Sequence, residues 1–259
     1  MGTIRFVLDN QIEEVAVADT TATVLDHLRY KMARTGTKEG CSEGDCGACT
    51  VLVGTLAGDQ IEWRAVNACI LFLPMLEGRA VLTVESLSRD GALHPVQQAL
   101  VDFHGSQCGF CTPGFVMSLY ARSIEACGTK GEPVGDVIAG NLCRCTGYGP
   151  ILEAGNAVPV SRRDDTETIR LLRSIADDEP LDITLHDPQT GGDRQWLTPR
   201  NLDQMATMLV ENPGAQVLAG GTDVGLWVTK RQDRPTCLVW LGDVAELNHI
   251  TDDPDALTL

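Results

Sequence analysis

Four cysteines in the first third of the chain have a spacing that suits an iron-sulfur cluster. Gaps of four and two residues separate Cys41, Cys46 and Cys49, and Cys69 follows after a long gap. This is the spacing of plant-type ferredoxins, whose thiolates hold a [2Fe-2S] cluster. Glycines among the first three cysteines allow the backbone to turn around a cluster and to point amides at its sulfurs. The alternative is a four-cysteine zinc site, whose cysteine pairs usually have gaps of two to four residues on both sides.

A second set of four cysteines consists of two close pairs, Cys108 with Cys111 and Cys143 with Cys145. Gaps of two residues and one residue are unusual for a zinc ribbon, but on their own they do not identify the metal group. Each pair directly precedes a predicted helix start. Because a helix N-terminus has free amides and a partial positive charge, two such starts facing each other would suit an anionic cluster.

Cys127 and Cys237 are given no role, because a lone cysteine is more often a small buried apolar residue than a ligand. Eight cysteines already complete the two sets. We therefore expect none of the histidines to be a ligand: His27, His94, His104, His186 and His249.

A glycine loop near the end of the chain could bind a phosphate group. It lies between a predicted strand and a predicted helix and consists of Ala219, Gly220, Gly221, Thr222 and Asp223. Backbone amides in such a loop can hold a pyrophosphate against the helix dipole. A Gly-Gly-Thr turn is common, so the residues alone leave this role open.

The first part of the chain predicts mainly strands, and the second part predicts helices. Residues 1–84 show the alternation of strands at 4–8, 12–17, 50–53, 61–66 and 80–84. One helix, capped by Thr21, is expected between the second and third of these strands. Residues 85–160 instead predict four short helices, which begin near His94, Thr112, Pro133 and Pro150. Thr112 is the expected capping residue of the second helix.

The last part of the chain predicts a linker followed by alternating helices and strands. Residues 161–185 carry many charges and predict an interdomain linker with at most two helical turns. In residues 186–259 we expect a helix opening at Thr198-Pro199 and strands near 215–218 and 236–241. About 75 residues are few for an α/β domain, so we expect this region to be the beginning of one.

Composition excludes several classes of protein. The chain has 259 residues, of which 43% are hydrophobic and 22% charged, the proportions of a globular protein. Its formal charge of −16 argues against a surface that neutralises nucleic-acid phosphates. The N-terminus lacks a secretory signal pattern, and no apolar run approaches the roughly 20 residues of a membrane span. We therefore expect a cytoplasmic protein, in which clustered cysteines are metal ligands before they are disulfides.

Five stretches that contain both cysteine sets resemble the two iron-sulfur domains of the molybdenum hydroxylase family. They are GTKEGCSEGDCGACTVLV, NACILFLP, LHPVQQAL, HGSQCGFCTPGFVMS and AGNLCRCTGYGPI. The resemblance is dense over residues 3–157 and looser over 196–250. It implies an α+β multidomain chain with four parts: a β-grasp plant-type ferredoxin domain (1–84), a four-helix [2Fe-2S] domain (85–160), a linker (161–185) and the N-terminal part of an α/β FAD-binding domain (186–259).

The resemblance also implies roles for the site residues. The first cysteine set would hold the cluster nearer the flavin, and the second set the cluster nearer a molybdenum cofactor. Gln107 and Cys145 would approach the pterin of that cofactor. The loop VLAGGTDVGL resembles the family's loop for the FAD pyrophosphate. No stretch resembles the molybdenum-binding domain, which a partner chain would supply by docking around residues 107–114 and 143–148.

The domain order resembles that of the purine-oxidising members of the family. Such a chain would contain no catalytic residue and would pass electrons from the molybdenum cofactor of a partner subunit through two [2Fe-2S] clusters to FAD and NAD+. The expected assembly is a dimer of heterodimers. Two alternatives stay open. One is the equivalent subunit of a family member that oxidises an aldehyde, carbon monoxide, nicotinate or an aromatic thioester, and the other is a zinc-stabilised scaffold without redox activity.

Overall fold

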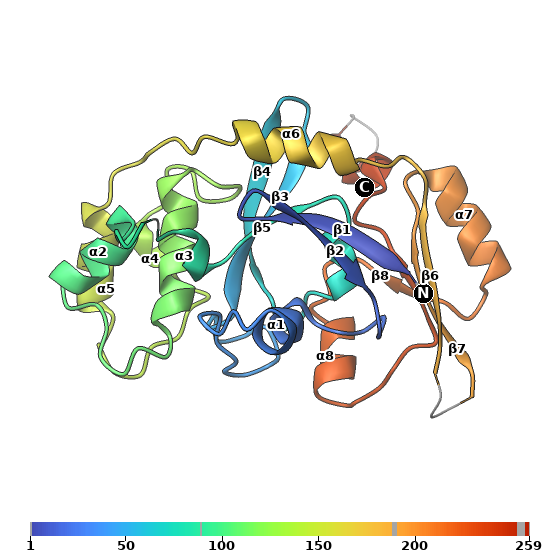
Figure 1. The fold of residues 1–259 in the computed structure, drawn as a ribbon, viewed down its shortest axis with the longest axis horizontal. Helices are drawn as coiled ribbons and strands as arrows, with labels where there is room; N and C mark the ends of the chain where they lie inside the picture. Colours follow the sequence, from blue (N-terminus) through green and yellow to red (C-terminus); the bar gives the residue numbers. More distant parts are fainter. Residues whose placement is uncertain (1, 89, 188–190, 253–256, 259) are drawn as a thin grey trace.

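The computed structural model describes residues 2–88, 90–187, 191–252 and 257–258. Figure 1 shows three parts side by side: a group of helices, a central five-stranded sheet, and a second sheet with its own helices. No helix in these ranges combines the length and the apolar character needed to cross a membrane.

The central sheet has the strand order β2-β1-β5-β3-β4. Its strands are β1 (Thr3–Leu8), β2 (Gln11–Ala16), β3 (Thr50–Ala57), β4 (Gln60–Asn67) and β5 (Ala80–Leu82). The outer pairs β1-β2 and β3-β4 are antiparallel hairpins, whereas β1 and β5 are parallel. Short 3-10 helices precede and follow β5, at Leu73–Leu76 (η2) and Val84–Ser86 (η3). The expected β-grasp arrangement is confirmed.

The helix beside this sheet begins two residues later than predicted. It comprises α1 (Val24–Asp26) and a π-helical continuation, η1 (His27–Lys31). Its cap is Thr23, whose hydroxyl accepts a hydrogen bond from the Asp26 amide at 3.1 Å. The predicted cap, Thr21, was wrong because its hydroxyl donates to Asp19 at 2.7 Å in the preceding turn.

The four predicted short helices of the next part are present: α2 (Pro95–Asp102), α3 (Thr112–Ser123), α4 (Val134–Val137) and α5 (Gly149–Ala157). One predicted cap differs. Cys111 occupies the capping position of α3, and Thr112 is already the first helical residue. The Thr112 hydroxyl lies 2.8 Å from that of Ser106 and therefore joins the preceding loop to the helix.

The segment expected to be a linker contains a ten-residue helix, α6 (Thr166–Ile175), which is longer than predicted. Four of its residues are buried: Thr168, Leu171, Leu172 and Ile175. Their spacing places them on one face, which packs against the central sheet, and the charged residues cover the other face. Before α6, the Trp63 indole donates to Asp165 at 3.0 Å and Arg163 stacks over the Trp63 ring.

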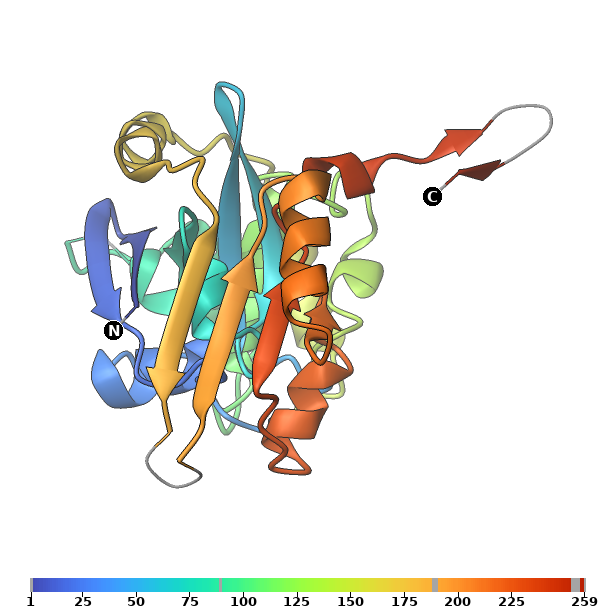
Figure 2. The same cartoon turned by 90° about the vertical axis from the view of Figure 1, so that its right-hand side faces the viewer.

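The last part is a four-stranded sheet of order β6-β7-β9-β8 with two helices (Figure 2). Its elements are β6 (Leu181–His186), β7 (Asp193–Thr198), α7 (Leu202–Glu211), β8 (Gln216–Leu218), α8 (Val224–Thr229) and β9 (Cys237–Trp240), followed by η4 (Ala245–Asn248), β10 (Thr251–Asp252) and β11 (Leu257–Thr258). Helix α7 is capped by Asn201, not opened at Thr198. The Thr198 hydroxyl instead accepts from the Trp196 indole at 2.9 Å within β7.

Two hydrophobic cores cross the borders between these parts. One joins the central sheet to the last part, where Phe72 meets Trp196 edge to face at 6.1 Å between ring centroids. The other joins Val7, Leu52 and Trp63 of the central sheet to the helices and to α6. Continuous packing of this kind holds the loops between the parts in fixed relative positions.

Candidate iron-sulfur and flavin sites

The first cysteine set is assembled at one end of the β3-β4 hairpin. Thr50 pairs with Asn67 in that hairpin, so Cys49 before β3 and Cys69 after β4 come together at the same end. Their thiols contact each other, as do those of Cys41 and Cys46 in the preceding loop. The structure thus brings together all four cysteines of the predicted set, in two pairs.

Backbone amides surround the sulfurs of this set. The Cys41 sulfur accepts hydrogen bonds from the amides of Glu43, Asp45 and Cys46 at 3.3–3.4 Å. Gly44 donates to the Cys69 sulfur at 3.3 Å. Burial alone would raise the pKa of Cys41, but the three amides outweigh it and hold that pKa below its ordinary value. Positive φ angles at Gly44 and Gly47 allow this tight turn.

The second cysteine set lies where α3 and α5 begin. Cys108 contacts Cys145, and Cys111 contacts Cys143, again giving two pairs of thiols. The Tyr148 hydroxyl accepts from the Cys143 amide at 2.9 Å and ties the loop to the start of α5. The Tyr148 ring also meets Phe115 of α3 edge to face at 6.2 Å. The two helix starts therefore lie next to each other, which is the arrangement that would suit an anionic cluster.

The arrangement of the thiols suits clusters with two metal ions. The eight cysteines form four contacting pairs of thiols, two pairs in each set. A [2Fe-2S] cluster needs such a donor set, with two thiolates for each iron.

The two cysteine loops touch through their backbones. The Leu142 amide, next to Cys143, donates to the carbonyl oxygen of Cys46 at 2.9 Å. Gly114 of α3 lies against the Gly47 carbonyl so closely that a Cβ atom on Gly114 would clash with it. This junction was missed from the sequence, because nothing in the local pattern shows that Gly47 and Gly114 meet.

Asn141 completes this junction and was also missed. Its side chain is buried and donates to the Gly47 carbonyl at 3.0 Å. It also accepts a hydrogen bond from the Ser118 hydroxyl of α3 at 2.7 Å. One carboxamide thus connects the first cysteine loop, the second cysteine loop and α3. In the sequence, the only signal for this role of Asn141 is that a polar residue lies between the two cysteine pairs of the second set.

The predicted phosphate loop lies between β8 and α8 and leaves room for a ligand. Its residues are exposed apart from Gly221, whose φ of +84° favours glycine. A Cβ atom on Gly220 would meet no atom within 4 Å, so the loop surface is open. The Trp240 indole fixes the loop from behind by donating to the Ala219 carbonyl at 2.9 Å. The shape of this loop suits a phosphate group approaching its backbone.

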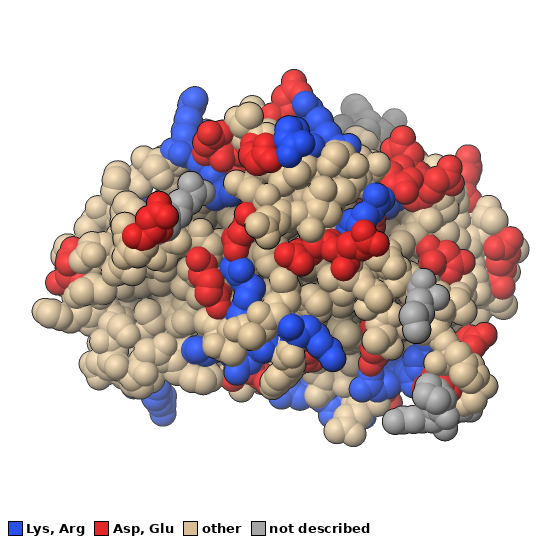
Figure 3. Space-filling model, viewed as in Figure 1, with Lys and Arg blue, Asp and Glu red and all other residues tan. Residues whose placement is uncertain are grey.

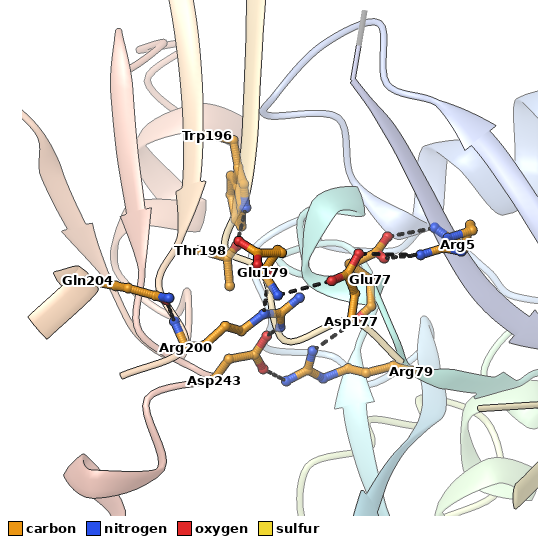
Figure 4. Close-up of polar contacts among 10 residues, drawn as sticks. All are labelled: Arg5, Glu77, Arg79, Asp177, Glu179, Trp196, Thr198, Arg200, Gln204 and Asp243. Carbon is orange, nitrogen blue, oxygen red and sulfur yellow. Dashed lines mark hydrogen bonds and ion pairs between the residues drawn. The ribbon is translucent and has the colours of Figure 1, made fainter. Parts of the chain in front are cut away.

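A polar network holds the last part against the central sheet (Figure 4). Asp243 accepts from Arg79 at 2.5 Å and also pairs with Arg200. Arg79 directly precedes β5 and also stacks over Trp240, 4.6 Å from the ring centroid. The network lies at the junction of the parts and fixes their relative orientation.

Two large apolar side chains are exposed beside the second cysteine set, next to the exposed and charged Arg144. Gln107, Cys108 and Cys145 are exposed, and so are Phe110 (48%) and Leu142 (50%). Figure 3 shows that the end of the molecule formed by the helices is mostly uncharged on this face, whereas charges crowd over the rest. Exposed apolar groups next to a cysteine site are typical of a surface that a partner covers.

Three family profiles match the chain in succession. They are described as a 2Fe-2S iron-sulfur cluster binding domain (residues 6–73), a [2Fe-2S] binding domain (83–156) and an FAD binding domain in molybdopterin dehydrogenase (190–259). Two [2Fe-2S] clusters and FAD are therefore the cofactors of this chain. The eight cysteines and the glycine loop lie within the three matched ranges.

Known proteins agree with these matches. The xanthine dehydrogenase of Drosophila subobscura is 35% identical over 92% of this chain, which covers 21% of that protein. Quinoline 2-oxidoreductase from Pseudomonas putida 86 is 30% identical, with a TM-score of 0.52 over 66% of this chain and 96% of that chain. Aldehyde oxidoreductase from Desulfovibrio gigas is 33% identical, with a TM-score of 0.53 over 60% of this chain and 16% of its own.

The chain spans about a fifth of the xanthine dehydrogenases that it matches along most of its length. The order of its parts is that of two iron-sulfur domains followed by a flavin domain. The chain therefore belongs to the molybdenum hydroxylase family and is an iron-sulfur and FAD-binding, electron-transfer part of such an oxidoreductase.

Proposed function

We propose that this chain is the electron-transfer subunit of a xanthine dehydrogenase. When bound, each [2Fe-2S] cluster carries one electron at a time, and FAD carries two. The chain could therefore connect the two-electron oxidation of a substrate with the two-electron reduction of the final acceptor. The observation that carries the proposal is the hydrogen bond from the Leu142 amide to the Cys46 carbonyl, which joins the two cysteine loops directly. Matches to xanthine dehydrogenases along most of the chain support the assignment.

In this proposal each group of residues has a defined task. The first set holds the cluster nearer FAD (Cys41, Cys46, Cys49 and Cys69), and the second set holds the cluster nearer the molybdenum cofactor (Cys108, Cys111, Cys143 and Cys145). The loop from Ala219 to Asp223 binds the FAD pyrophosphate, and the exposed Gln107 faces the pterin. No residue of this chain acts as a catalytic acid or base, because these side chains only bind and orient cofactors.

The finer features of the proposal follow from the family resemblance. Hypoxanthine or xanthine is hydroxylated at the molybdenum cofactor of a large partner subunit, and NAD+ is the final electron acceptor. We place the complex in the cytoplasm, as a dimer of heterodimers. A reducing compartment is where clustered cysteines serve as metal ligands before they form disulfides.

The partner is proposed to cover the exposed apolar side chains beside the second cysteine set. Placing a carboxylate at Phe110 or Leu142 would bury a charge in that interface, which is strongly unfavourable. We expect Phe110→Asp to lose the molybdenum subunit in co-purification, while the iron content of the chain is kept. The exposed Val210 of α7 offers a matched control, since Val210→Asp should co-purify normally. Full co-purification of Phe110→Asp would place the interface elsewhere.

Xanthine-dependent reduction of NAD+ by the purified complex tests the function itself. The expected result is activity that disappears when molybdenum is withheld. A complex that holds iron, flavin and molybdenum but ignores xanthine would assign the chain to a hydroxylase of aldehydes or other substrates. That second candidate is favoured by the likeness to aldehyde oxidoreductase. A zinc scaffold would be colourless, and the two [2Fe-2S] profile matches argue against it.

A further inference from the structure

Ile70, the residue after Cys69, is enclosed by glycines from three segments. Its side chain is 7% exposed. A Cβ atom on Gly44 in the first cysteine loop would lie 2.5 Å from Ile70 Cδ1. A Cβ on Gly221 of the flavin loop would lie 2.8 Å from the Ile70 carbonyl oxygen, and one on Gly225 of α8 would lie 3.0 Å from Ile70 Cβ. Because these glycines leave little or no room for a Cβ atom, the backbones of the three segments lie directly against Ile70.

A second contact joins the other end of α8 to the same cysteine loop. Lys230, the residue after α8, donates from Nζ to the Cys41 carbonyl at 2.5 Å. It also pairs with Glu43 at 3.2 Å. Helix α8 therefore meets the first cysteine set at two places, near Cys69 and at Cys41. Figure 1 shows α8 lying beside the central part of the molecule.

We propose that Ile70 and Lys230 are positioning residues that couple the flavin loop to the first iron-sulfur cluster. This rests on the proposed function, because it places that cluster and FAD at the sites named above. Helix α8 follows the flavin loop directly, so a movement of the loop on pyrophosphate binding presses α8 against Ile70. Ile70 is covalently bonded to the cluster ligand Cys69. The environment of the first cluster therefore depends on whether FAD is bound.

Low-temperature EPR of the reduced complex, recorded before and after FAD is removed with concentrated salt, tests this coupling. We expect removal of FAD to shift the g values of the ferredoxin-type cluster and to leave those of the helical-domain cluster unchanged. In Gly225→Ala the added methyl group would lie 3.0 Å from Ile70 Cβ, so the contact between α8 and Ile70 must shift, and Lys230→Met removes the contact to Cys41. In both variants we expect the shift to shrink or vanish.

Matched controls lie in the helical domain. A Cβ on Gly135 of α4 would meet only Leu152 at 3.9 Å, so Gly135→Ala should keep the full shift, and so should Lys130→Met. A full shift in Gly225→Ala and Lys230→Met, or no shift in the unsubstituted complex, would overturn the coupling. If Gly225→Ala does not accumulate, Lys230→Met decides, because its side chain is half exposed. An unsubstituted complex without iron or FAD would instead refute the proposed function.

Discussion

The carboxamide of Asn141 fills a buried position between the two cysteine loops, where it meets the Gly47 carbonyl and the Ser118 hydroxyl. Asn141→Ala would leave the buried Ser118 hydroxyl without its partner, whereas the Gly47 carbonyl keeps hydrogen bonds from the amide and the hydroxyl of Thr50. The cost of one such unpaired group is about 1–3 kcal/mol. We expect a lower midpoint of urea unfolding and a weaker magnetic interaction between the two reduced clusters. Asn248, near the end of the described chain, offers an exposed control for the same substitution.

The buried His27 makes the stability of the folded chain depend on pH. Burial lowers its pKa, Lys31 lowers it further, and its buried Nε2 has no hydrogen-bond partner in the ranges the structure describes. An unfolded histidine titrates near pH 6.5. Below about pH 6.5 the unfolded chain therefore binds a proton that the folded chain resists, and stability falls as the pH drops.

The measurement is the apparent melting temperature between about pH 7.5 and 5.5. We expect a decline on the acidic side that is smaller in His27→Gln, because glutamine does not titrate. The exposed His186 should not contribute in the same way, so His186→Gln should retain the decline of the unsubstituted chain. Equal acid sensitivity in both variants would show that other groups cause it.

Residue types and spacing predict the two cysteine sets well, because ligand spacing is a local property of the sequence. The contacts of Asn141 and of Gly114 with Gly47 could not be predicted, since they join segments that are far apart in the chain, 94 positions in the case of Asn141. The two misplaced caps have a similar cause. Thr21 and Thr112 suit a capping position locally, but each hydroxyl is engaged by a neighbouring residue.

At the scale of elements, α6 is the largest departure from the predicted organisation. Its charges suggested a linker, yet Leu171, Leu172 and Ile175 form an apolar face that the central sheet covers. Charged residues on the exposed face masked this pattern. A segment that packs in this way adds to the stability of the domains it connects.

Leu172→Ala tests the contribution of α6. Leu172 is 1% exposed, and removing a buried leucine side chain costs about 2–5 kcal/mol. We expect a clear loss of stability in chemical unfolding and faster proteolysis near residues 176–180. Arg170→Ala on the exposed face of the same helix should leave the unfolding midpoint close to that of the unsubstituted chain. Similar values for both variants would mean that α6 is only a tether.

At the scale of the whole molecule, the three parts share their cores and a network of charges. Asp243 lies between Arg79 and Arg200, and all three side chains are largely buried. Asp243→Asn removes the carboxylate that the two guanidinium groups share, which costs about 3–5 kcal/mol where such pairs are buried. We expect the variant to lose FAD during purification and to be cleaved between the central sheet and the last part. Asp193→Asn, at an exposed ion pair, should behave normally.

The parallel pairing of β1 with β5 also affects the order in which the first domain folds. Val7 pairs with Ala80 in parallel, and the whole segment that carries Cys41 to Cys69 lies between these two strands in the chain. Contacts between distant positions form late during folding, because a long loop must close first. We therefore expect an iron-sulfur donor to reach the first four thiols more readily before β5 pairs with β1 than after this pairing.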